Sequence, residues 1–342
     1  HGGRAEPFEL PWPTLAEFPS FGLVRKRADF DELLANRAVV KGATLYEQAN
    51  VTGTVVDERT DRVTGVTTKD GRTFTAPIVV AADGNSSPVA KSMGLLKNAK
   101  RPMGVACRTY FTSPRHDDDW MESWLELWDG KPGESNLLPG YGWIFGMGDG
   151  TCNVGLGTVA SSATSQKLNF RELMKTWTAN TPAEWGFTPE NQVGPISSAA
   201  LPMAFNRKPA YTRGLVLVGD SGGMVSPFNG EGIPYAMEAG EAAAEAIGRA
   251  HAEGVGTRAA EKALQGYPSR LAAEWGGYYR LGTIFVKLIE HPAVMRLCVR
   301  YGLPRPVLMR FTIKLLAHLY DTKDGDWMDK VIHSLTTVVP AA

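Results

Sequence analysis

The segment LVLVGDSGG, residues 215–223, constrains the fold of this chain more than any other segment. Its apolar first half is typical of a buried strand, and the Ala-rich segment 230–250 that follows predicts a long helix. A buried strand that ends in glycines and leads into a helix indicates an α/β layer. Because glycine lets a ligand approach the backbone closely, such a turn suits a polar or anionic ligand.

The five residues Gly219–Gly223 also have the sequence that surrounds the nucleophilic serine of chymotrypsin-like proteases. Such an enzyme needs a histidine base and a buried aspartate before the serine, on two β-barrels. The only internal histidine before Ser221 is His116, which lies in an acidic loop, and the chain continues after the serine into a predicted helix. The sequence therefore favours a ligand-binding turn in which Asp220 makes the contact.

Composition excludes several classes of protein. Lys and Arg number 36 and Asp and Glu number 36, so no net charge attracts nucleic acid. The three cysteines, Cys107, Cys152 and Cys298, lie too far apart to predict a disulfide framework or a zinc site, and the acidic run 117–119 is interpreted as a solvated loop rather than a metal site. The sequence has neither a signal peptide nor an apolar run of about 18 residues, so we expect a cytoplasmic protein.

The pattern along the chain predicts four segments. Residues 1–100 contain a helix at 28–40, which Asp29 or Asp31 could cap, and strands at 43–49, 51–58, 62–68, 72–77 and 79–82. Residues 101–205 contain long antiparallel strands, a helix near 166–178 and a strand at 193–199. Residues 206–255 return to strand and helix, and residues 256–342 are predicted to be helical.

A second aspartate–glycine pair, Asp83-Gly84, follows the apolar strand of VVAADGNSSPVAK. Together with LVLVGDSGGMVSPFNGEGI, it resembles the DG and GD motifs of flavoproteins related to p-hydroxybenzoate hydroxylase. YGWIFGMGDG, followed by NVGLG, resembles the Tyr-x-Trp-x-Phe-Pro segment of geranylgeranyl reductases. The resemblance covers almost the whole chain and is strongest for the actinobacterial branch that reduces an isoprene unit of the menaquinone tail.

The resemblance implies a mixed α/β fold: a truncated Rossmann-like FAD-binding domain with an inserted antiparallel sheet and a helical C-terminal tail. It implies FAD as cofactor, with NAD(P)H or another reductant as the electron source. Tyr141, Trp143 and Phe145 would form a wall for the isoprenoid substrate, with Tyr141 as the candidate proton donor. The implied cofactor-binding residues are Arg27, Asp83, Gly84, Gly219, Asp220, Pro227, Asn229, Gly230, Glu231, Gly232 and Ile233.

This sequence departs from the family pattern in three places. Gly146 replaces a proline, and Ala90 replaces an arginine for which Lys91 is the available substitute. The N-terminal Gly-x-Gly-x-x-Gly unit, which would hold the cofactor's pyrophosphate, is missing. The nearest internal match, 155–160, lies in a predicted hairpin without a following helix and is not such a fingerprint. We therefore expect the chain to be truncated and to bind FAD weakly or not at all.

The implied reaction is reduction of a C=C bond in a geranylgeranyl group or menaquinone tail by hydride from reduced flavin. An aromatic hydroxylase or halogenase on the same scaffold is the alternative enzyme. Halogenases carry Trp-x-Trp-x-Ile-Pro where this chain has Tyr-x-Trp-x-Phe-Gly. An inactive fragment that only binds lipid is the third interpretation.

The C-terminal region is rich in basic residues. Within 304–320, the helical pattern places Arg310, Lys314 and His318 opposite Leu308, Leu315 and Leu319. This pattern suits an interfacial helix on anionic lipid, at the inner face of the cytoplasmic membrane, and equally suits a helix with a solvated basic face.

Overall fold

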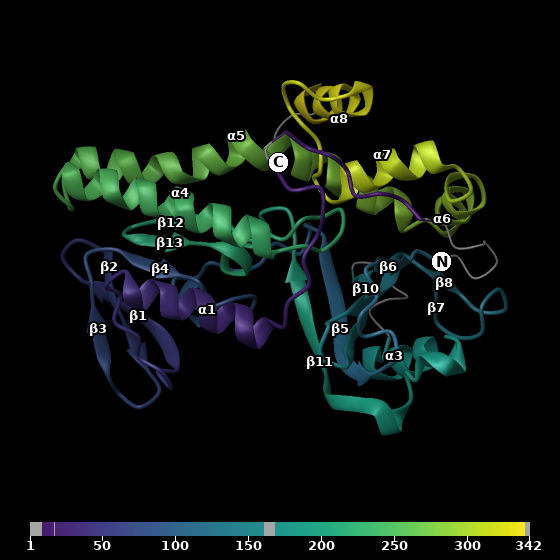
Figure 1. The fold of residues 1–342 in the computed structure, drawn as a ribbon. Helices are drawn as coiled ribbons and strands as arrows, with labels where there is room; N and C mark the ends of the chain where they lie inside the picture. The colour runs from purple at the N-terminus through teal and green to yellow at the C-terminus, as the bar shows by residue number, and fades with distance from the viewer. Residues whose placement is uncertain (1–8, 17, 161–167, 339–342) are drawn as a thin grey trace. The chain divides into compact units, whose positions relative to one another are not determined.

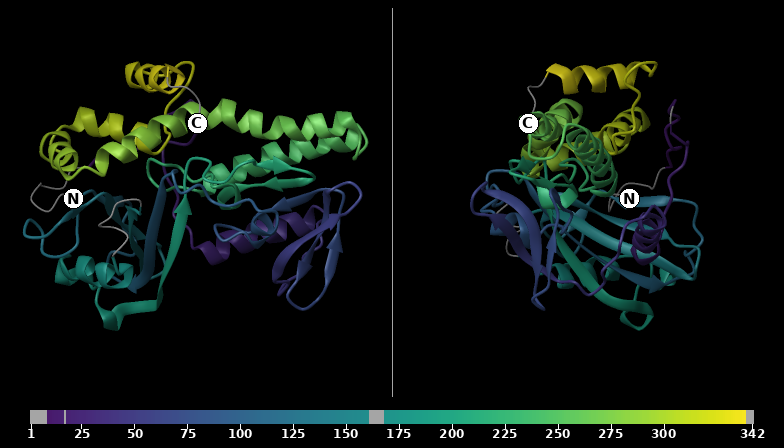
Figure 2. Two further views of the ribbon diagram at one scale, coloured as in Figure 1. Left: turned by 180° about the vertical axis from the view of Figure 1, so that it is seen from behind. Right: turned by 90° about the vertical axis from the view of Figure 1, so that its left-hand side faces the viewer.

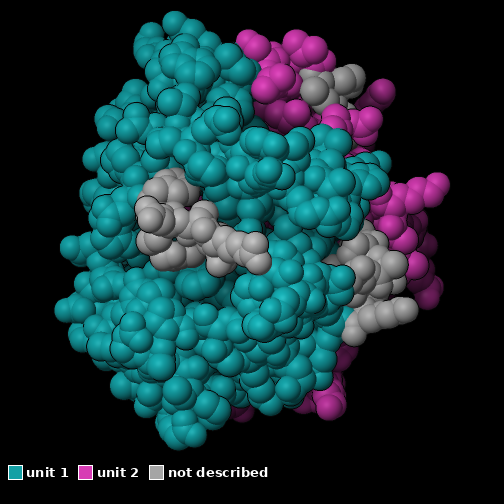
Figure 3. Space-filling view, turned by 90° about the vertical axis from the view of Figure 1, so that its right-hand side faces the viewer, with its two compact units in different colours: residues 1–46, 104–200, 287–332 teal, residues 47–103, 201–286, 333–342 magenta. Residues whose placement is uncertain are grey.

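The computed structural model describes residues 9–16, 18–160 and 168–338. These residues form two compact units, each assembled from segments far apart in the sequence (Figure 3). Unit 1 comprises residues 1–46, 104–200 and 287–332, and unit 2 comprises residues 47–103, 201–286 and 333–342. The predicted mixed α/β class is confirmed, and the four predicted segment boundaries stay a prediction.

Unit 2 contains two small sheets and two long helices. One sheet is antiparallel, with order β1-β2-β3 (Val51–Asp57, Arg62–Thr68, Thr73–Thr75). The other has order β12-β13-β4 (Tyr211–Thr212, Leu215–Leu217, Val79–Ala81), in which β13 and β4 are parallel. The helices are α2 (Pro88–Ser92), α4 (Ile233–Ala252) and most of α5 (Arg258–Ile289).

The parallel pair forms the core of unit 2. Leu215 and Leu217 of β13 are fully buried and pack with Val63, Ala81 and Val89. A strand buried on both faces explains the continuous apolar run that the sequence shows here. The Asp70-Gly71 hairpin between β2 and β3 is also as predicted, with Gly71 at φ +86°.

Helices α4 and α5 lie side by side above this sheet in Figures 1 and 2. The indole N–H of Trp275 in α5 donates to Glu238 of α4 at 3.0 Å. Two tyrosines of α5 donate to backbone carbonyls below: Tyr267 to Leu217 at 2.8 Å and Tyr279 to Met224 at 2.7 Å. Helix α5 therefore fixes the end of β13 and the segment that follows it.

Unit 1 is built on a five-stranded antiparallel sheet, as the aromatic and β-branched composition predicts. Its order is β11-β5-β10-β9-β6 (Gln192–Pro202, Met103–Thr112, Thr151–Val159, Gly140–Gly146, Met121–Trp124). A short hairpin, β7 with β8 (Leu127–Trp128, Leu137–Leu138), extends beside it. Helix α3 (Phe170–Ala179) begins after the capping residue Asn169, and residues 166 and 167 of the predicted helix lie outside the described residues.

One face of this sheet packs on α3 and the other carries aromatic rings. Gly142 and Ile144 of β9 point to the α3 side, where an added Cβ on Gly142 would lie 2.3 Å from the ring of Trp177. Tyr141, Trp143 and Phe145 alternate with them and point to the opposite face, as the two-residue period of a strand requires.

The remaining helices of unit 1 lie in its N-terminal and C-terminal segments. They are α1 (Arg27–Val40), α6 (Pro292–Leu297), a π-helical turn (Cys298–Gly302), α7 (Pro306–Leu316) and the first half of α8 (Trp327–Val338). None of the described helices is long and apolar enough to cross a bilayer.

Two predictions in the first segment are wrong. Residues 43–49 form an irregular segment with a turn at 47–48 rather than a strand, and Leu45 and Tyr46 are exposed. A short apolar stretch becomes a strand only where it has a partner. Helix α1 begins after Lys26 without a side-chain cap, and Asp31 instead pairs with Arg27 at 2.9 Å.

The basic face predicted for 304–320 is also wrong. Helix α7 ends at Leu316, before His318. Lys314 is buried and donates to Asp329 at 2.6 Å and to Asp326 at 2.9 Å. Burial alone would lower the pKa of Lys314, but these two hydrogen bonds outweigh it and the pKa is raised. Burial lowers the pKa of His318 to about 4, so this side chain is neutral at pH 7.

Gly155 of β10 gives a test of the aromatic face. A Cβ there would lie 2.2 Å from Cζ2 of Trp143, whereas a Cβ on Gly157 of the same strand would meet nothing nearer than 3.6 Å. Gly155→Ala should therefore lower the free energy of unfolding by about 1–3 kcal/mol through overpacking. The control Gly157→Ala should be neutral or stabilising by up to about 1 kcal/mol, because glycine is a poor strand former. Equal stability of both variants in urea unfolding would show that the indole does not lie across Gly155.

Candidate functional site

Two turns meet at one edge of the parallel pair in unit 2. Strand β4 pairs in register with β13, so that Ala81 and Leu217, their last residues, lie side by side. The DG turn (residues 83–87) follows β4, and the GD turn (residues 219–223) follows β13. The carboxyl edge of parallel strands is where open α/β sheets bind ligands. The structure thus brings Asp83, Gly84, Gly219 and Asp220 into one region.

Ser221 is a structural tie between the two strands. Its side chain is fully buried, and its Oγ lies 2.5 Å from the carbonyl oxygen of Ala81 and 2.7 Å from that of Val218. The same Oγ accepts the backbone N–H of Val218 at 3.1 Å. A hydroxyl enclosed by backbone groups is not an exposed nucleophile, and this agrees with a ligand-binding turn.

The GD turn lies against the first turn of α4. Gly219 has φ +58°, and a Cβ on it would lie 3.0 Å from Cβ of Ala236. A Cβ on Gly232, which caps α4, would lie 3.2 Å from Oδ1 of Asp220. Any larger residue at these positions would push the turn away from the helix, whose first N–H groups have no side-chain cap. The GD turn therefore lies next to the N-terminus of α4, the positive end of the helix dipole.

The loop before α4 is shaped by its own side chains. Oδ1 of Asn229 accepts the backbone N–H of Glu231 at 3.0 Å, and Gly230 has φ +76°. Pro227 is buried against α5, where a Cβ on Gly282 would lie 2.4 Å from its ring. Ile233 is exposed at the start of α4. These residues adjoin the GD turn along the chain, and their contact with a cofactor stays a prediction.

The Asp83 side chain stabilises the DG turn through hydrogen bonds. Its carboxylate accepts the hydroxyl of Ser87 at 2.6 Å and the backbone N–H of Val89 at 3.1 Å, which fixes the start of α2. Gly84 has φ +74°, and a Cβ on it would meet no atom within 4 Å. Its backbone therefore faces open space, as close approach by a ligand requires.

Arg207 is a residue of the candidate site that the sequence did not reveal. Its side chain is buried, and its guanidinium donates to the Ser221 carbonyl of the GD turn at 2.5 Å and to the Asn85 carbonyl of the DG turn at 3.4 Å. Lys97 donates to the side-chain oxygen of the same Asn85. Burial lowers the pKa of Arg207, and the Asp83 carboxylate partly offsets this. One cation thus holds both turns.

The residues around the turns fit a bound cofactor. Among the described residues, Nε of Arg207 is buried without a hydrogen-bond partner, and such an orphaned donor is uncommon in a complete site. The open backbone at Gly84 and the uncapped start of α4 are two further features that an anionic dinucleotide would satisfy. No pattern in the loop NRKPAYT marks Arg207 in advance, because its partners are backbone atoms.

Arg27 lies in unit 1, at the start of α1, and pairs with Asp31. The two turns belong to unit 2, and the place of Arg27 near a pyrophosphate stays a prediction.

The predicted substrate residues form a row on the sheet of unit 1. The ring centroids of Tyr141 and Trp143 are 6.0 Å apart, and those of Trp143 and Phe145 are 6.5 Å apart and stacked. The indole N–H of Trp143 donates to Asn153 at 3.2 Å. All three rings are half-buried, whereas Ile144 on the other face is fully buried. The two glycines opposite the row, Gly155 and Gly157, leave room for the rings to lie across β10.

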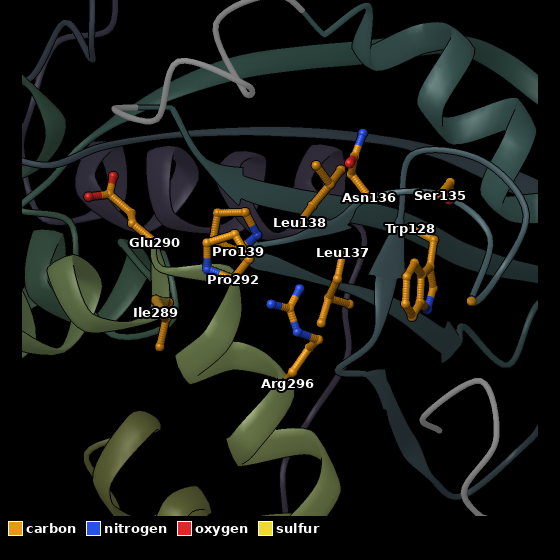
Figure 4. Close-up of a pocket in the computed structure, with 11 residues that line it drawn as sticks. Trp128, Ser135, Asn136, Leu137, Leu138, Pro139, Ile289, Glu290, Pro292 and Arg296 are labelled. Atoms are coloured by element: carbon orange, nitrogen blue, oxygen red, sulfur yellow. The ribbon is translucent and has the colours of Figure 1, made fainter.

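Unit 1 also contains a cavity of about 300 Å³ between the β7–β8 hairpin and the start of α6 (Figure 4). In Figure 4 the side chain of Arg296 extends from α6 toward Leu137. None of the three rings of the row lines this cavity. Its lining residues are Trp128, Gly133, Ser135, Asn136, Leu137, Leu138, Pro139, Ile289, Glu290, Pro292 and Arg296.

In the described part of the chain, no group of three metal-ligating side chains could hold an ion. Asp118 of the acidic run pairs with Arg115, whose guanidinium also stacks 4.1 Å from the ring centroid of Trp185.

Arg207 gives a prediction that needs no substrate. Arg207→Met keeps the apolar stem but leaves two backbone carbonyls without their donor, so amide hydrogen exchange should accelerate in the DG and GD turns together. Flavin affinity should fall by about tenfold or more, the loss expected for a buried hydrogen bond from a charged group.

The matched control is Arg101→Met. Arg101 also donates to a backbone carbonyl, that of Ala204 at 3.2 Å, which belongs to neither turn. Two results would contradict the role of Arg207 in joining the turns. Amide hydrogen exchange could rise in only one of the two turns of Arg207→Met, or it could rise equally in Arg207→Met and Arg101→Met.

Comparison with known proteins adds family membership to this geometry. Residues 22–270 match the FAD binding domain family. The menaquinone reductase of Mycobacterium tuberculosis is 30% identical over 323 residues, which cover 94% of this chain and 75% of that protein. Digeranylgeranylglycerophospholipid reductase 1 of Methanococcoides burtonii is 30% identical over 258 residues, which cover 75% of this chain and 59% of that protein.

A solved structure shows the same fold. The geranylgeranyl bacteriochlorophyll reductase-like protein of Thermoplasma acidophilum superposes with a TM-score of 0.68 at 18% identity, over 90% of this chain and 75% of that chain. A flavin-dependent brominase superposes with a TM-score of 0.62, also at 18% identity, over 92% of this chain and 75% of that chain. The chain therefore belongs to the FAD binding domain family of oxidoreductases, in its geranylgeranyl reductase branch.

Proposed function

We propose that this protein uses reduced FAD to add hydrogen across a C=C bond of an isoprenoid chain, in a geranylgeranyl group or a menaquinone tail. The observation that carries the proposal is the row of Tyr141, Trp143 and Phe145 on one sheet face, opposite glycines that give the rings space. Three half-buried rings in line offer a continuous apolar surface to a long flexible chain. Two of the relatives, a menaquinone reductase and a digeranylgeranylglycerophospholipid reductase, support the same type of substrate.

The two turns of unit 2 would hold the cofactor. Arg207 and Ser221 fix the turns to each other, and Asp220 and the loop 227–233 stand at the start of α4. When bound, reduced FAD supplies the hydride, and the protein provides orientation and a dry environment. NAD(P)H or another reductant would supply the electrons.

Tyr141 is the proposed proton donor, since it carries the one hydroxyl in the row. It lies at one end of the row, 6.0 Å from Trp143 between ring centroids. A hydroxyl at that place could protonate the alkene carbon that does not receive the hydride.

Product analysis without oxygen tests this function. The protein is saturated with excess FAD, because we expect weak binding, and FAD occupancy is measured by absorbance. It is then reduced chemically under argon and given a geranylgeranyl lipid or a menaquinone. The expected product gains two hydrogens for each double bond reduced. A hydroxylated product that forms only with oxygen would establish the monooxygenase alternative, and FAD-loaded protein that converts neither lipid would refute the proposal.

The same assay examines the proton donor. Tyr141→Phe should lower kcat by about 100-fold, as expected for loss of a general acid, while FAD stays bound. Tyr110→Phe is the control, because Tyr110 pairs across Asn153 with Phe145 and lies on the same face. Equal kcat in both variants would exclude Tyr141 as the donor.

We also propose peripheral contact with the inner face of the cytoplasmic membrane through residues 292–316, which keep Leu308 and Arg310 of the sequence pattern but not the buried Lys314. Apolar and basic side chains are both exposed here, which suits the surface of an anionic bilayer. The apolar ones are Leu297, Tyr301, Val307 and Leu308, and the basic ones are Arg296, Arg300, Arg305 and Arg310. A lipid substrate would reach the enzyme from that bilayer.

Vesicle sedimentation tests this contact. The protein should sediment with phosphatidylglycerol vesicles and not with phosphatidylcholine vesicles. Arg305→Ser with Arg310→Ser should weaken this binding by about tenfold or more, because each cation near an anionic surface contributes about 1 kcal/mol. The control, Arg171→Ser with Lys175→Ser, removes the same charge from α3. Equal losses in the two double variants would indicate attraction by net charge alone and contradict the assignment.

A further inference from the structure

The aromatic face of the sheet in unit 1 also carries a cation. Arg108 of β5 pairs with Gly155 of β10, and Gly155 pairs on its other side with Trp143 of β9. Cross-strand partners point to the same face of an antiparallel sheet. Arg108 and Trp143 therefore flank a position that has no side chain, on the face that carries the aromatic row.

Arg108 has no counter-charge on this face. Its guanidinium lies 5.0 Å from the ring centroid of Tyr110, and among the described residues no carboxylate forms a salt bridge with it. Lys26 lies 5.6 Å over the same ring and forms an ion pair with Asp149. That pair lowers the pKa of Asp149 to about 2. Of the two cations at Tyr110, only Lys26 has its charge balanced within the described chain.

This combination of groups matches an amphiphile. A half-buried guanidinium without a salt-bridge partner among the described residues has N–H donors that a ligand can use. Its planar fork presents two parallel N–H donors to two oxygen acceptors, a fixed geometry that the ammonium group of a lysine lacks. The faces of the adjoining rings offer apolar surface, and their polar groups are the Tyr141 hydroxyl and the Trp143 N–H that Asn153 accepts. An isoprenoid whose head carries acceptor oxygens satisfies both parts.

We propose that Arg108 is a specificity-determining residue that binds the oxygen-bearing head group of the isoprenoid substrate while the aromatic row holds its chain. The inference rests on the proposed function and deepens it, since it states which end of the substrate is recognised and by what. The shared chemistry is an acceptor oxygen next to a prenyl chain. Phosphate oxygens of a prenyl diphosphate and carbonyl oxygens of a prenylated naphthoquinone are the two sources.

The experiment compares three substrates in the FAD-loaded protein: a prenyl diphosphate, a prenylated naphthoquinone and a prenyl hydrocarbon without a head group. Arg108→Met should raise KM for the recognised head group by about tenfold or more, the effect of losing a charged hydrogen bond. Neither kcat nor the KM for the hydrocarbon should change. The substrate with the largest KM increase identifies the head group.

Two further variants control the result. Arg108→Lys keeps the charge but loses the fork, and its KM should lie between those of the wild type and Arg108→Met. Arg171→Met removes an exposed arginine from α3, on the opposite side of the sheet, and should leave all three KM values unchanged. Thermal unfolding of each variant confirms that the fold is kept, and equilibrium dialysis of the same ligands against oxidised protein measures binding without turnover.

Failure of this inference differs from failure of the proposed function. Wild-type protein that reduces none of the three substrates would refute the function. Wild-type protein that reduces them, with Arg108→Met showing the same KM values or an equal increase for the hydrocarbon, would refute the role of Arg108 and leave the function standing.

Discussion

The parallel pairing of β4 with β13 is the constraint on which the candidate cofactor site depends. Only this register brings the ends of both strands to one edge, so that the DG and GD turns become neighbours. Backbone pairing ends with the Val218 N–H, which donates to the Ala81 carbonyl at 3.1 Å. Beyond it, the Ser221 side chain bonds to the end of β4, and the Arg207 side chain joins the two turns. Helix α5 adds two tyrosine hydroxyls on the carbonyls of β13 and of the segment after it. The site is therefore built mainly from bonds to backbone atoms.

The parts of the fold that depend on short, local sequence patterns were predicted correctly. The apolar run of β13, the Asp-Gly hairpin and the alternating strands of unit 1 each follow from a short pattern. The prediction failed where the outcome depends on residues distant in the chain. Lys314 matches a solvated basic stripe by spacing, but Asp326 and Asp329 bury it. The apolar residues at 43–49 match a strand but have none to pair with.

The candidate site shows the same division. Glycines and aspartates at strand ends are visible in the sequence because their chemistry is local. Arg207 and Arg108 are not visible in the sequence. Arg207 is defined by the carbonyls it reaches, and Arg108 by the lack of a salt-bridge partner among the described residues. The glycines of β10 match a nucleotide fingerprint by spacing only, and the structure gives the reason for Gly155, which is space for the indole of Trp143.

The central claim is that isoprenoid, rather than oxygen, takes the electrons of the reduced flavin. Stopped-flow absorbance of FAD-loaded, chemically reduced protein mixed anaerobically with a prenyl lipid tests it most directly. The account predicts that the oxidised flavin spectrum returns at a rate that rises and saturates with lipid concentration, with saturated product appearing at the same rate. Flavin that stays reduced in the presence of the lipid and reoxidises only when oxygen is admitted would contradict it.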